Sequence, residues 1–431
     1  MTTDNKKYIE AKDCLPFTVN EEESHALLYF LKEVEPNILH FSIRQKEKEP
    51  LVYFDYNRRQ WFANRYIGEC EFVYNQQTYV LRITPRFGNQ LLLKLFEYIY
   101  ATKLPPSYHS LAKNKGLDIH KLLISIMWIS VLRKALRHGL LKENRKIKEQ
   151  GTTIRGKFLV RESLIDVKVS NTLSYEYTFK DVNNIPNQIL YKAYQILKRD
   201  YFLSDNLLSN IIKSDLHKLS SLVNTRQSIK LSDYKKIRLN SMFKGYRAML
   251  DLSWEIINAK ELSIENSNSL GKSFFLDMAE LWEVFVLKVI SKNLIPEGWN
   301  ILPNEHEIYK NTFYGRKLIP DIVIEKEDKI LIIDAKYKKM DFKKNDVDRN
   351  DIFQIHTYSY YFDDFNKEVY SSLVYPIEKE LYDKCNKQSI FNKGNHKNSF
   401  FIEGIEVDNS DIFDSKIIKF INSLIDKTSP K

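Results

Sequence analysis

The chain has 431 residues, a length that fits about two or three domains, each able to bury its own core. Its composition, 43% hydrophobic and 28% charged, is ordinary for a soluble globular protein, and glycine and proline, at 12 each, are too scarce for long flexible linkers. The formal net charge of +10 favours a polyanionic partner, but an AT-rich genome, which enriches Lys, Asn and Ile, gives the same excess without a functional cause.

The cysteines and the apolar segments bear on the compartment. Cys14, Cys70 and Cys385 lie far apart and form no Cys-x-x-Cys pair, which argues against a disulfide framework or a structural zinc site and fits a reducing compartment. The N-terminus lacks the apolar core of a signal peptide. The longest apolar stretch, 122–132, is too short to span a bilayer and fits a buried helix better than a membrane-surface helix. We therefore expect a cytoplasmic protein without membrane contact.

The first region, residues 1–110, is predicted to be a β-rich N-terminal module. Charged turns alternate there with strand-like runs at 51–54, 71–74 and 79–83. The segment Thr84-Pro85-Arg86 then ends a strand before a helical pattern over 91–100.

The middle region, residues 111–265, is predicted to be mostly helical. A helical pattern with a basic end covers about 120–148, and further helices cover about 188–262. Between them an extended patch opens at 154–160 and continues over 173–179.

A third region, residues 266–431, begins at the polar run 265–269, the best domain boundary in the chain. Its expected elements are a helix over 274–294, two strands within 318–337, a helix from about 351, strands at 369–375 and 400–407, and a closing helix. The three regions together predict the α/β class, in an α+β multidomain arrangement.

The most informative stretch is the pair of apolar runs 318–324 and 330–337, which a charged turn joins. Side chains alternate faces along a strand, so Asp334 and Lys336 project to one side, while Asp321 opens the partner strand. Two carboxylates beside a lysine suit a metal ion that activates water and steadies charge on a phosphate. The alternative is an ordinary hairpin with its charges in solvent, since acid-x-Lys recurs elsewhere in the chain.

Other side chains are candidates for the same site. Glu283 lies inside a nearly continuous apolar run, where a lone carboxylate is costly, so it either joins a metal site or lies on the exposed stripe of its helix. Glu280, one turn earlier, is the weaker candidate. Gln354 and Tyr358 share one helix face. Three roles are open for them: to hold a nucleic-acid phosphate, to brace Lys336, or to form a polar stripe over a core helix. His356 points away from that face and is expected to be structural.

No nucleotide-binding loop is expected. Gly271-Lys272-Ser273 resembles the end of a phosphate-binding loop, but Asn266 stands where the first glycine belongs and no strand precedes it. We therefore expect no nucleotide to bind to this chain itself.

Taken together, these residues resemble the McrC family, the nuclease subunits of McrBC-type, 5-methylcytosine-dependent restriction systems, whose C-terminal domains belong to the PD-(D/E)xK superfamily. The similar segments are Gly68 with 83–86, then 155–157, 181–190, 281–283, 320–321 and 333–337, and lastly Gln354 with Tyr358. Arg86 stands where the family is expected to carry lysine, and the first 50 or so residues match nothing in it.

The resemblance implies a role for each site residue. Asp321 and Asp334 would bind Mg²⁺, and Glu283 would complete or support the metal site. Lys336 would orient or activate the attacking water. The supporting side chains would be Gln354 and Tyr358.

The resemblance also implies a partner, an McrB-like AAA+ GTPase ring that recognises modified double-stranded DNA and whose GTP hydrolysis the chain stimulates. The basic pair Arg155 and Lys157, between two helical blocks, is the candidate for ring contact. The leading expectation is thus a Mg²⁺-dependent DNA endonuclease subunit of an antiviral restriction system. Two alternatives stay open: an autonomous repair-type nuclease, and a non-catalytic adaptor that activates a GTPase and binds DNA.

Overall fold

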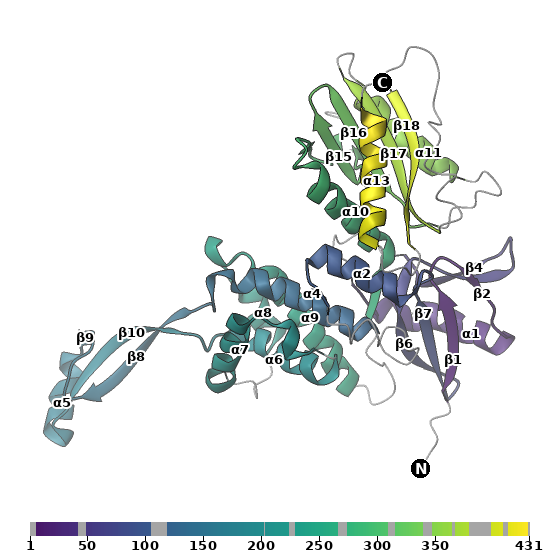
Figure 1. Ribbon diagram of the computed structural model, residues 1–431. Helices are drawn as coiled ribbons and strands as arrows, with labels where there is room; N and C mark the ends of the chain where they lie inside the picture. Colours follow the sequence, from purple (N-terminus) through teal and green to yellow (C-terminus); the bar gives the residue numbers. More distant parts are fainter. Residues whose placement is uncertain are drawn as a thin grey trace. The chain divides into compact units, whose positions relative to one another are not determined.

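The computed structural model (Figure 1) describes residues 6–41, 49–104, 119–201, 203–223, 229–265, 274–308, 315–338, 347–363, 367–378, 398–407 and 413–429. The chain divides into two compact units, one of residues 1–120 with 266–431 and one of residues 121–265. The regions predicted as an N-terminal module and a C-terminal domain therefore belong to one compact unit. No helix in the described ranges has the length and hydropathy needed to cross a bilayer.

The N-terminal part of the first unit contains a five-stranded sheet of order β1-β7-β6-β11-β3, to which the later segment Phe274–Asp277 contributes β11, and a three-stranded sheet of order β2-β5-β4. Its elements are β1 Lys7–Lys12, β2 Pro16–Phe17, α1 Glu21–Tyr29, η1 Phe30–Val34, η2 Glu35–Asn37, β3 Leu39–Phe41, β4 Val52–Asp55, β5 Gln60–Ala63, β6 Tyr66–Tyr74, β7 Gln77–Thr84 and α2 Gly88–Tyr100.

Strands β6 and β7 form the centre of the larger sheet. The turn between them, Asn75 and Gln76, has φ values of 49° and 63°, the left-handed pair that a two-residue hairpin turn requires. Alternate side chains, including Phe72, Tyr79 and Leu81, lie in one apolar core. The strands expected at 71–74 and 79–83 are thus confirmed.

The helix expected over 274–294 begins later than predicted. Phe274–Asp277 forms strand β11, which pairs in parallel with β3 and antiparallel with β6. Asp277 then caps α10, Met278–Leu294, by accepting hydrogen bonds from the N–H groups of Ala279 and Glu280. Pairing with strands more than 200 positions away in the chain overrides the local helical pattern, which a single segment cannot reveal.

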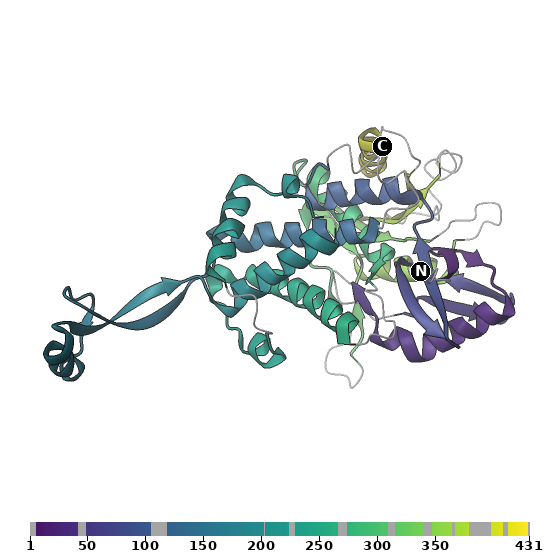
Figure 2. The ribbon, with the colours of Figure 1, turned by 90° about the horizontal axis from the view of Figure 1, so that it is seen from below.

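The second unit combines a helical body with a long hairpin that extends away from it (Figures 1 and 2). The body contains α4 Ile119–Ala135, η3 Leu136–His138, α6 Ile185–Asp200, η4 Asp205–Leu207, α7 Asn210–Leu222, α8 Leu231–Lys236, η5 Ser241–Phe243 and α9 Tyr246–Glu265. The hairpin consists of β8 Glu143–Gly151 and β10 Leu173–Asp181, with β9 Lys157–Phe158 and α5 Val160–Ser170 at its far end.

Two predictions for this unit are corrected. The helical pattern expected to about residue 148 ends with α4 and η3, and Glu143–Gly151 is strand β8. Gly139, with a φ of 78°, breaks the helix because it adopts a conformation that other residues rarely adopt. The patch expected to be extended from 154 to 179 contains the helix α5.

The C-terminal part of the first unit is a five-stranded sheet of order β12-β15-β16-β17-β18, flanked by helices. Its elements are α10, then β12 Asn300–Ile301, β13 His306–Glu307, β14 Lys317–Leu318, β15 Ile322–Lys326, β16 Lys329–Ala335, α11 Arg349–Tyr361, β17 Glu368–Ile377, β18 Asn398–Glu406 and α13 Phe413–Thr428. The pair β15–β16 is antiparallel, whereas β16–β17 and β17–β18 are parallel.

Both faces of this sheet are buried. Ile330 and Ile332 share an apolar cluster with Ile355 of α11, while the alternate residues Leu331 and Ile333 are fully buried on the other face. Asp334 continues the alternation of Ile330 and Ile332, so it lies on the face that α11 covers. This placement brings the polar face of α11 to the end of β16.

Candidate active site

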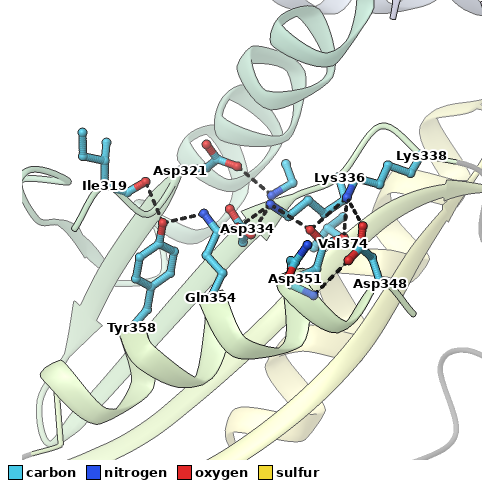
Figure 3. A network of polar contacts seen from close by, with 12 residues as sticks. Ile319, Asp321, Asp334, Lys336, Lys338, Asp348, Asp351, Gln354, Tyr358 and Val374 are labelled. Atoms are coloured by element: carbon cyan, nitrogen blue, oxygen red, sulfur yellow. Dashed lines mark hydrogen bonds and ion pairs between the residues drawn. The ribbon is translucent and has the colours of Figure 1, made fainter. Parts of the chain in front are cut away.

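Asp321 and Asp334 lie side by side where the β15–β16 hairpin opens (Figure 3). Ile322 pairs with Ile333, so the next residues outward are Asp321 and Asp334. The Asp321 carboxylate accepts a hydrogen bond of 2.8 Å from the N–H of Ala335. Asp334 is only 2% exposed. The structure therefore places the two carboxylates together, as the alternation pattern predicts.

Lys336 extends from the end of β16 into the same site. Its Nζ lies 2.7 Å from Asp334 Oδ2 and donates a 2.8 Å hydrogen bond to Gln354 Oε1. Burial lowers the pKa of Lys336, but the carboxylates of Asp334 and Asp351 outweigh burial and raise it. The side chain is thus an ammonium ion held among carboxylates. This cation compensates the negative charge of the buried carboxylates around it.

Gln354 and Tyr358 extend the contact chain from Lys336 along α11. Gln354 Nε2 donates to the Tyr358 hydroxyl at 2.7 Å, and that hydroxyl donates to the carbonyl of Ile319 at 3.3 Å. Burial raises the pKa of Tyr358. Because Ile319 lies just before Asp321, these bonds tie the helix to both strands of the hairpin (Figure 3). Of the alternatives left open by the sequence, bracing of the lysine is the one that these contacts match.

Asp351 is a further site residue, one that was not among the candidates predicted from the sequence. It is 3% exposed and lies 3.5 Å from Lys336 Nζ. It also accepts hydrogen bonds of 3.0 and 3.1 Å from Lys338 and one of 3.4 Å from the Tyr375 hydroxyl. Helical spacing could have put Asp351 on the same face as Gln354 and Tyr358, but its approach to Lys336 depends on the packing of α11 against the sheet.

Glu283 and Glu280 are both buried on α10. Glu283 is 7% exposed and Glu280 1%, so the exposed-stripe alternative for Glu283 is wrong. In the described residues, however, no three Asp, Glu, His or Cys side chains are grouped so that they could hold a metal ion. The structure therefore does not join Glu283 to Asp321 and Asp334 in one cluster.

The donor set at the hairpin opening fits Mg²⁺ with two carboxylates. Asp334 Oδ2 is buried and, in the described part of the chain, accepts no hydrogen bond, its nearest cation being the ammonium of Lys336. A buried carboxylate oxygen whose partner is an ammonium, beside a second carboxylate, is a suitable ligand pair. Mg²⁺ in proteins is commonly bound by one or two carboxylates together with water and substrate phosphates.

The other candidate residues lie on the hairpin of the second unit. Arg155 and Lys157 are both exposed. Between them Gly156 has a φ of 85°, and a Cβ there would come within 2.6 Å of the Glu176 carbonyl oxygen. The Arg-Gly-Lys order thus has a structural basis, since only glycine lets β9 approach β10 so closely. His356, expected to be structural, packs against the ring of Phe400.

Comparisons with known proteins are consistent with this fold. A chain in the refined half-complex from the tetradecameric assembly of Thermococcus gammatolerans McrB AAA+ hexamers with bound McrC is 15% identical, with a TM-score of 0.55, and the match covers 97% of this chain and 100% of that one. A second structure, the Thermococcus gammatolerans McrBC complex, is 16% identical, with a TM-score of 0.37, over 67% of this chain and 88% of that one. No curated protein matches the sequence.

The family comparison covers the greater part of the chain, including every candidate residue above. The family described as McrBC 5-methylcytosine restriction system component matches residues 62–376. This range contains the β15–β16 hairpin, α11, α10 and the long hairpin of the second unit. The chain therefore belongs to the McrBC 5-methylcytosine restriction system component family.

Proposed function

We propose that this chain is the Mg²⁺-dependent DNA endonuclease subunit of a modification-dependent restriction system. The observation that carries the proposal is the convergence of Asp321, Asp334 and Lys336 at one hairpin opening, with Lys336 held by Gln354. Bound there, Mg²⁺ would supply the charge that activates water and stabilises the phosphate in the transition state. Family membership supports a role in restriction, and the carboxylate pair supports the hydrolytic step.

The residues of the chain divide the work of this reaction. Asp321 and Asp334 would hold the ion. Lys336, as an ammonium, would donate hydrogen bonds that orient the attacking water or a phosphate oxygen. Gln354 and Tyr358 would keep that ammonium in place through the contacts described above. Glu283 would support the site from α10.

An AAA+ GTPase ring of the McrB type is the proposed partner, which would deliver modified double-stranded DNA. In the similar solved structure, McrC is bound to McrB hexamers. The contact surface proposed here is the far end of the long hairpin. Besides the basic pair Arg155 and Lys157, its helix α5 exposes large apolar side chains, with Leu164 65%, Ile165 67% and Val169 81% exposed. Exposed apolar side chains that cluster in this way are typical of a protein interface.

A cleavage assay tests the proposal. Methylated and unmethylated DNA is incubated with the chain, with and without the neighbouring gene's product, Mg²⁺ and GTP. We expect cleavage of methylated DNA only when the chain, its partner, Mg²⁺ and GTP are all present. Cleavage by the chain with Mg²⁺ alone would establish an autonomous nuclease instead. GTPase stimulation without cleavage under any condition would establish the adaptor.

A further inference from the structure

Arg86 makes an unusual contact with the nuclease sheet. Its guanidinium carbon lies 4.4 Å from the centre of the Tyr337 ring and 4.8 Å from that of Phe87. All three guanidinium nitrogens are buried and form no hydrogen bond with any described residue. Burying a cation without hydrogen bonds is costly, so the aromatic faces and a nearby negative charge must stabilise it.

The negative charge comes from Asp13, and topology explains its position. Strands β1 and β7 are parallel neighbours in which Lys12 pairs with Thr84, so the residues after each strand emerge at the same edge of the sheet. There the carboxylate of Asp13, which is fully buried, accepts a hydrogen bond from the backbone N–H of Arg86. This edge faces Tyr337, and Cys14 Sγ lies 3.8 Å from the Tyr337 carbonyl.

Tyr337 directly follows Lys336, so the same contact reaches the candidate active site. Tyr337 is 3% exposed, and its ring also packs edge-on against Phe87, with centroids 6.1 Å apart. The backbone N–H of Lys336 donates a 2.9 Å hydrogen bond to the carbonyl of Val374 on β17. The segment that carries Lys336 is therefore fixed to β17 on one side and to the N-terminal part on the other.

We infer that Arg86 is a positioning residue for cleavage: its guanidinium holds the Tyr337 ring and thereby fixes the backbone from which Lys336 projects. The N-terminal part of the first unit is then part of the nuclease apparatus, although it contributes no group to the site. As far as catalysis is concerned, the inference rests on the proposed function. The structural half of the inference, that Arg86 fixes the backbone at Lys336, does not depend on the proposed function.

The identity of residue 86 matters in this arrangement. A guanidinium is planar and stacks on an aromatic face, whereas a lysine ammonium is a compact point charge with stronger hydration. Arg86→Lys keeps the charge beside Asp13 and loses the planar contact. Tyr337→Phe keeps the ring and loses only the hydroxyl. Arg86→Lys therefore tests the stacking contact at constant charge, and Tyr337→Phe tests the hydroxyl with the stacking contact kept.

Hydrogen exchange on the full chain tests the structural half. We expect the Lys336 amide to exchange at least about 10-fold faster in Arg86→Met and by an intermediate factor in Arg86→Lys, with β15 and β17 unchanged. Arg82→Met is the matched control, because Arg82 lies on β7, four residues before Arg86, but pairs with Glu69 in a partly exposed ion pair. Unchanged protection of Lys336 in Arg86→Met, or equal acceleration throughout the sheet, would overturn the inference.

Cleavage kinetics with the partner, Mg²⁺ and GTP test the catalytic half. We expect kcat to fall about 10-fold or more in Arg86→Met, with partial rescue in Arg86→Lys, while KM for DNA and GTPase stimulation stay unchanged. Tyr337→Phe keeps the ring under the guanidinium, so its kcat should fall less than that of Arg86→Met. If Arg86→Met fails to fold, the comparison of Arg86→Lys with Tyr337→Phe tests the inference. An equal fall in kcat in these two variants would contradict positioning by stacking. An unaltered chain that never cleaves refutes the proposed function, whereas full activity of a folded Arg86→Met refutes this inference alone.

Discussion

Asp321 has two separable tasks at the candidate site. One is structural, since its carboxylate accepts a hydrogen bond from the N–H of Ala335 at the end of β16. The other is electrostatic, since its negative charge would hold the metal ion. Asp321→Asn keeps an oxygen that can accept the hydrogen bond and removes the charge. We expect this variant to lose cleavage by about 100-fold or more while its melting temperature changes by no more than about 2 °C.

Asp321→Ala is the companion variant, because it removes both the charge and the acceptor. Its melting temperature should fall further, since the N–H of Ala335 is then left without its acceptor. Thermal unfolding and partner-dependent cleavage are measured on both variants. Cleavage by Asp321→Asn at the rate of the unaltered chain would remove Asp321 from the proposed metal site.

Glu35 makes the stability of the N-terminal part depend on pH. Its carboxylate accepts a hydrogen bond from the N–H of Leu51, but burial outweighs this bond and raises the pKa of Glu35 to about 7. A carboxyl whose pKa is raised on folding contributes stability below its unfolded pKa, and this contribution is lost as the pH rises through the folded pKa. The loss should thus occur between about pH 4.5 and pH 7.

Glu35→Gln isolates this contribution. Its stability relative to the unaltered chain should rise between pH 4.5 and about 7 and stay level above that. The rise has an upper limit of about 3.5 kcal/mol, at roughly 1.4 kcal/mol for each pKa unit, and solvent screening of this partly exposed group lowers it. Urea unfolding at several pH values measures it, and Glu33→Gln in the same segment is the matched control. A stability difference that does not vary with pH would contradict the assigned burial of Glu35.

Sequence patterns predicted some site residues and missed others for a physical reason. Alternation along one strand puts Asp334 and Lys336 on one side, and the short hairpin turn pairs β15 with β16 so that Asp321 lies beside them. Asp351 approaches Lys336 only because α11 packs across β16 and β17, a contact that no local pattern encodes. The Arg86–Tyr337 contact joins residues about 250 positions apart and was equally hidden.

At the scale of whole elements, the long hairpin contains a strand that hydrophobic periodicity did not predict. Strand β8, Glu143–Gly151, is exposed or half-buried along its whole length. A strand without an apolar face has no alternation to detect, and its basic residues therefore appeared to continue α4. The buried strands β15 and β16 were predicted correctly because their apolar runs are continuous and end in a tight charged turn.

Gly156 determines whether the far end of the hairpin keeps its structure. A Cβ at this position would lie 2.6 Å from the Glu176 carbonyl oxygen and 2.8 Å from Tyr177 Cβ, and the φ of 85° adds strain. We expect Gly156→Ala to displace β9 from β10, which would expose the segment around 155–158 to proteases. Partner-stimulated GTP hydrolysis should fall with it if this end is the contact surface. Limited proteolysis and a GTPase assay measure the two effects.

Gly315→Ala is the matched control for that change. Among the residues that the structure describes, none has a heavy atom within 4 Å of a Cβ built at Gly315, so the same substitution meets no described neighbour. It should leave proteolysis and GTPase stimulation as they are in the unaltered chain. If Gly156→Ala also leaves both unchanged, then the close approach of β9 to β10 does not support the partner contact.

At the scale of the whole molecule, the candidate active site and the candidate partner surface belong to different units. The carboxylates lie in the unit formed by residues 1–120 and 266–431, and the long hairpin lies in the unit of residues 121–265. Each unit has its own core, so a surface change in one should leave the fold of the other intact. Cleavage chemistry and partner activation should therefore be separable by mutation.

The double variant Arg155→Glu/Lys157→Glu tests this separation. It should lower partner-stimulated GTP hydrolysis by about 10-fold or more, because reversed charges repel a surface that attracts cations. Calorimetric Mn²⁺ binding at the carboxylate pair should stay unchanged. Asp334→Asn should do the opposite, weakening Mn²⁺ binding while stimulation persists. Lys235→Glu/Lys236→Glu, an exposed pair on α8 of the same unit, matches the change in net charge. Equal loss of stimulation in both double variants would mean that net charge, and not the hairpin, attracts the partner.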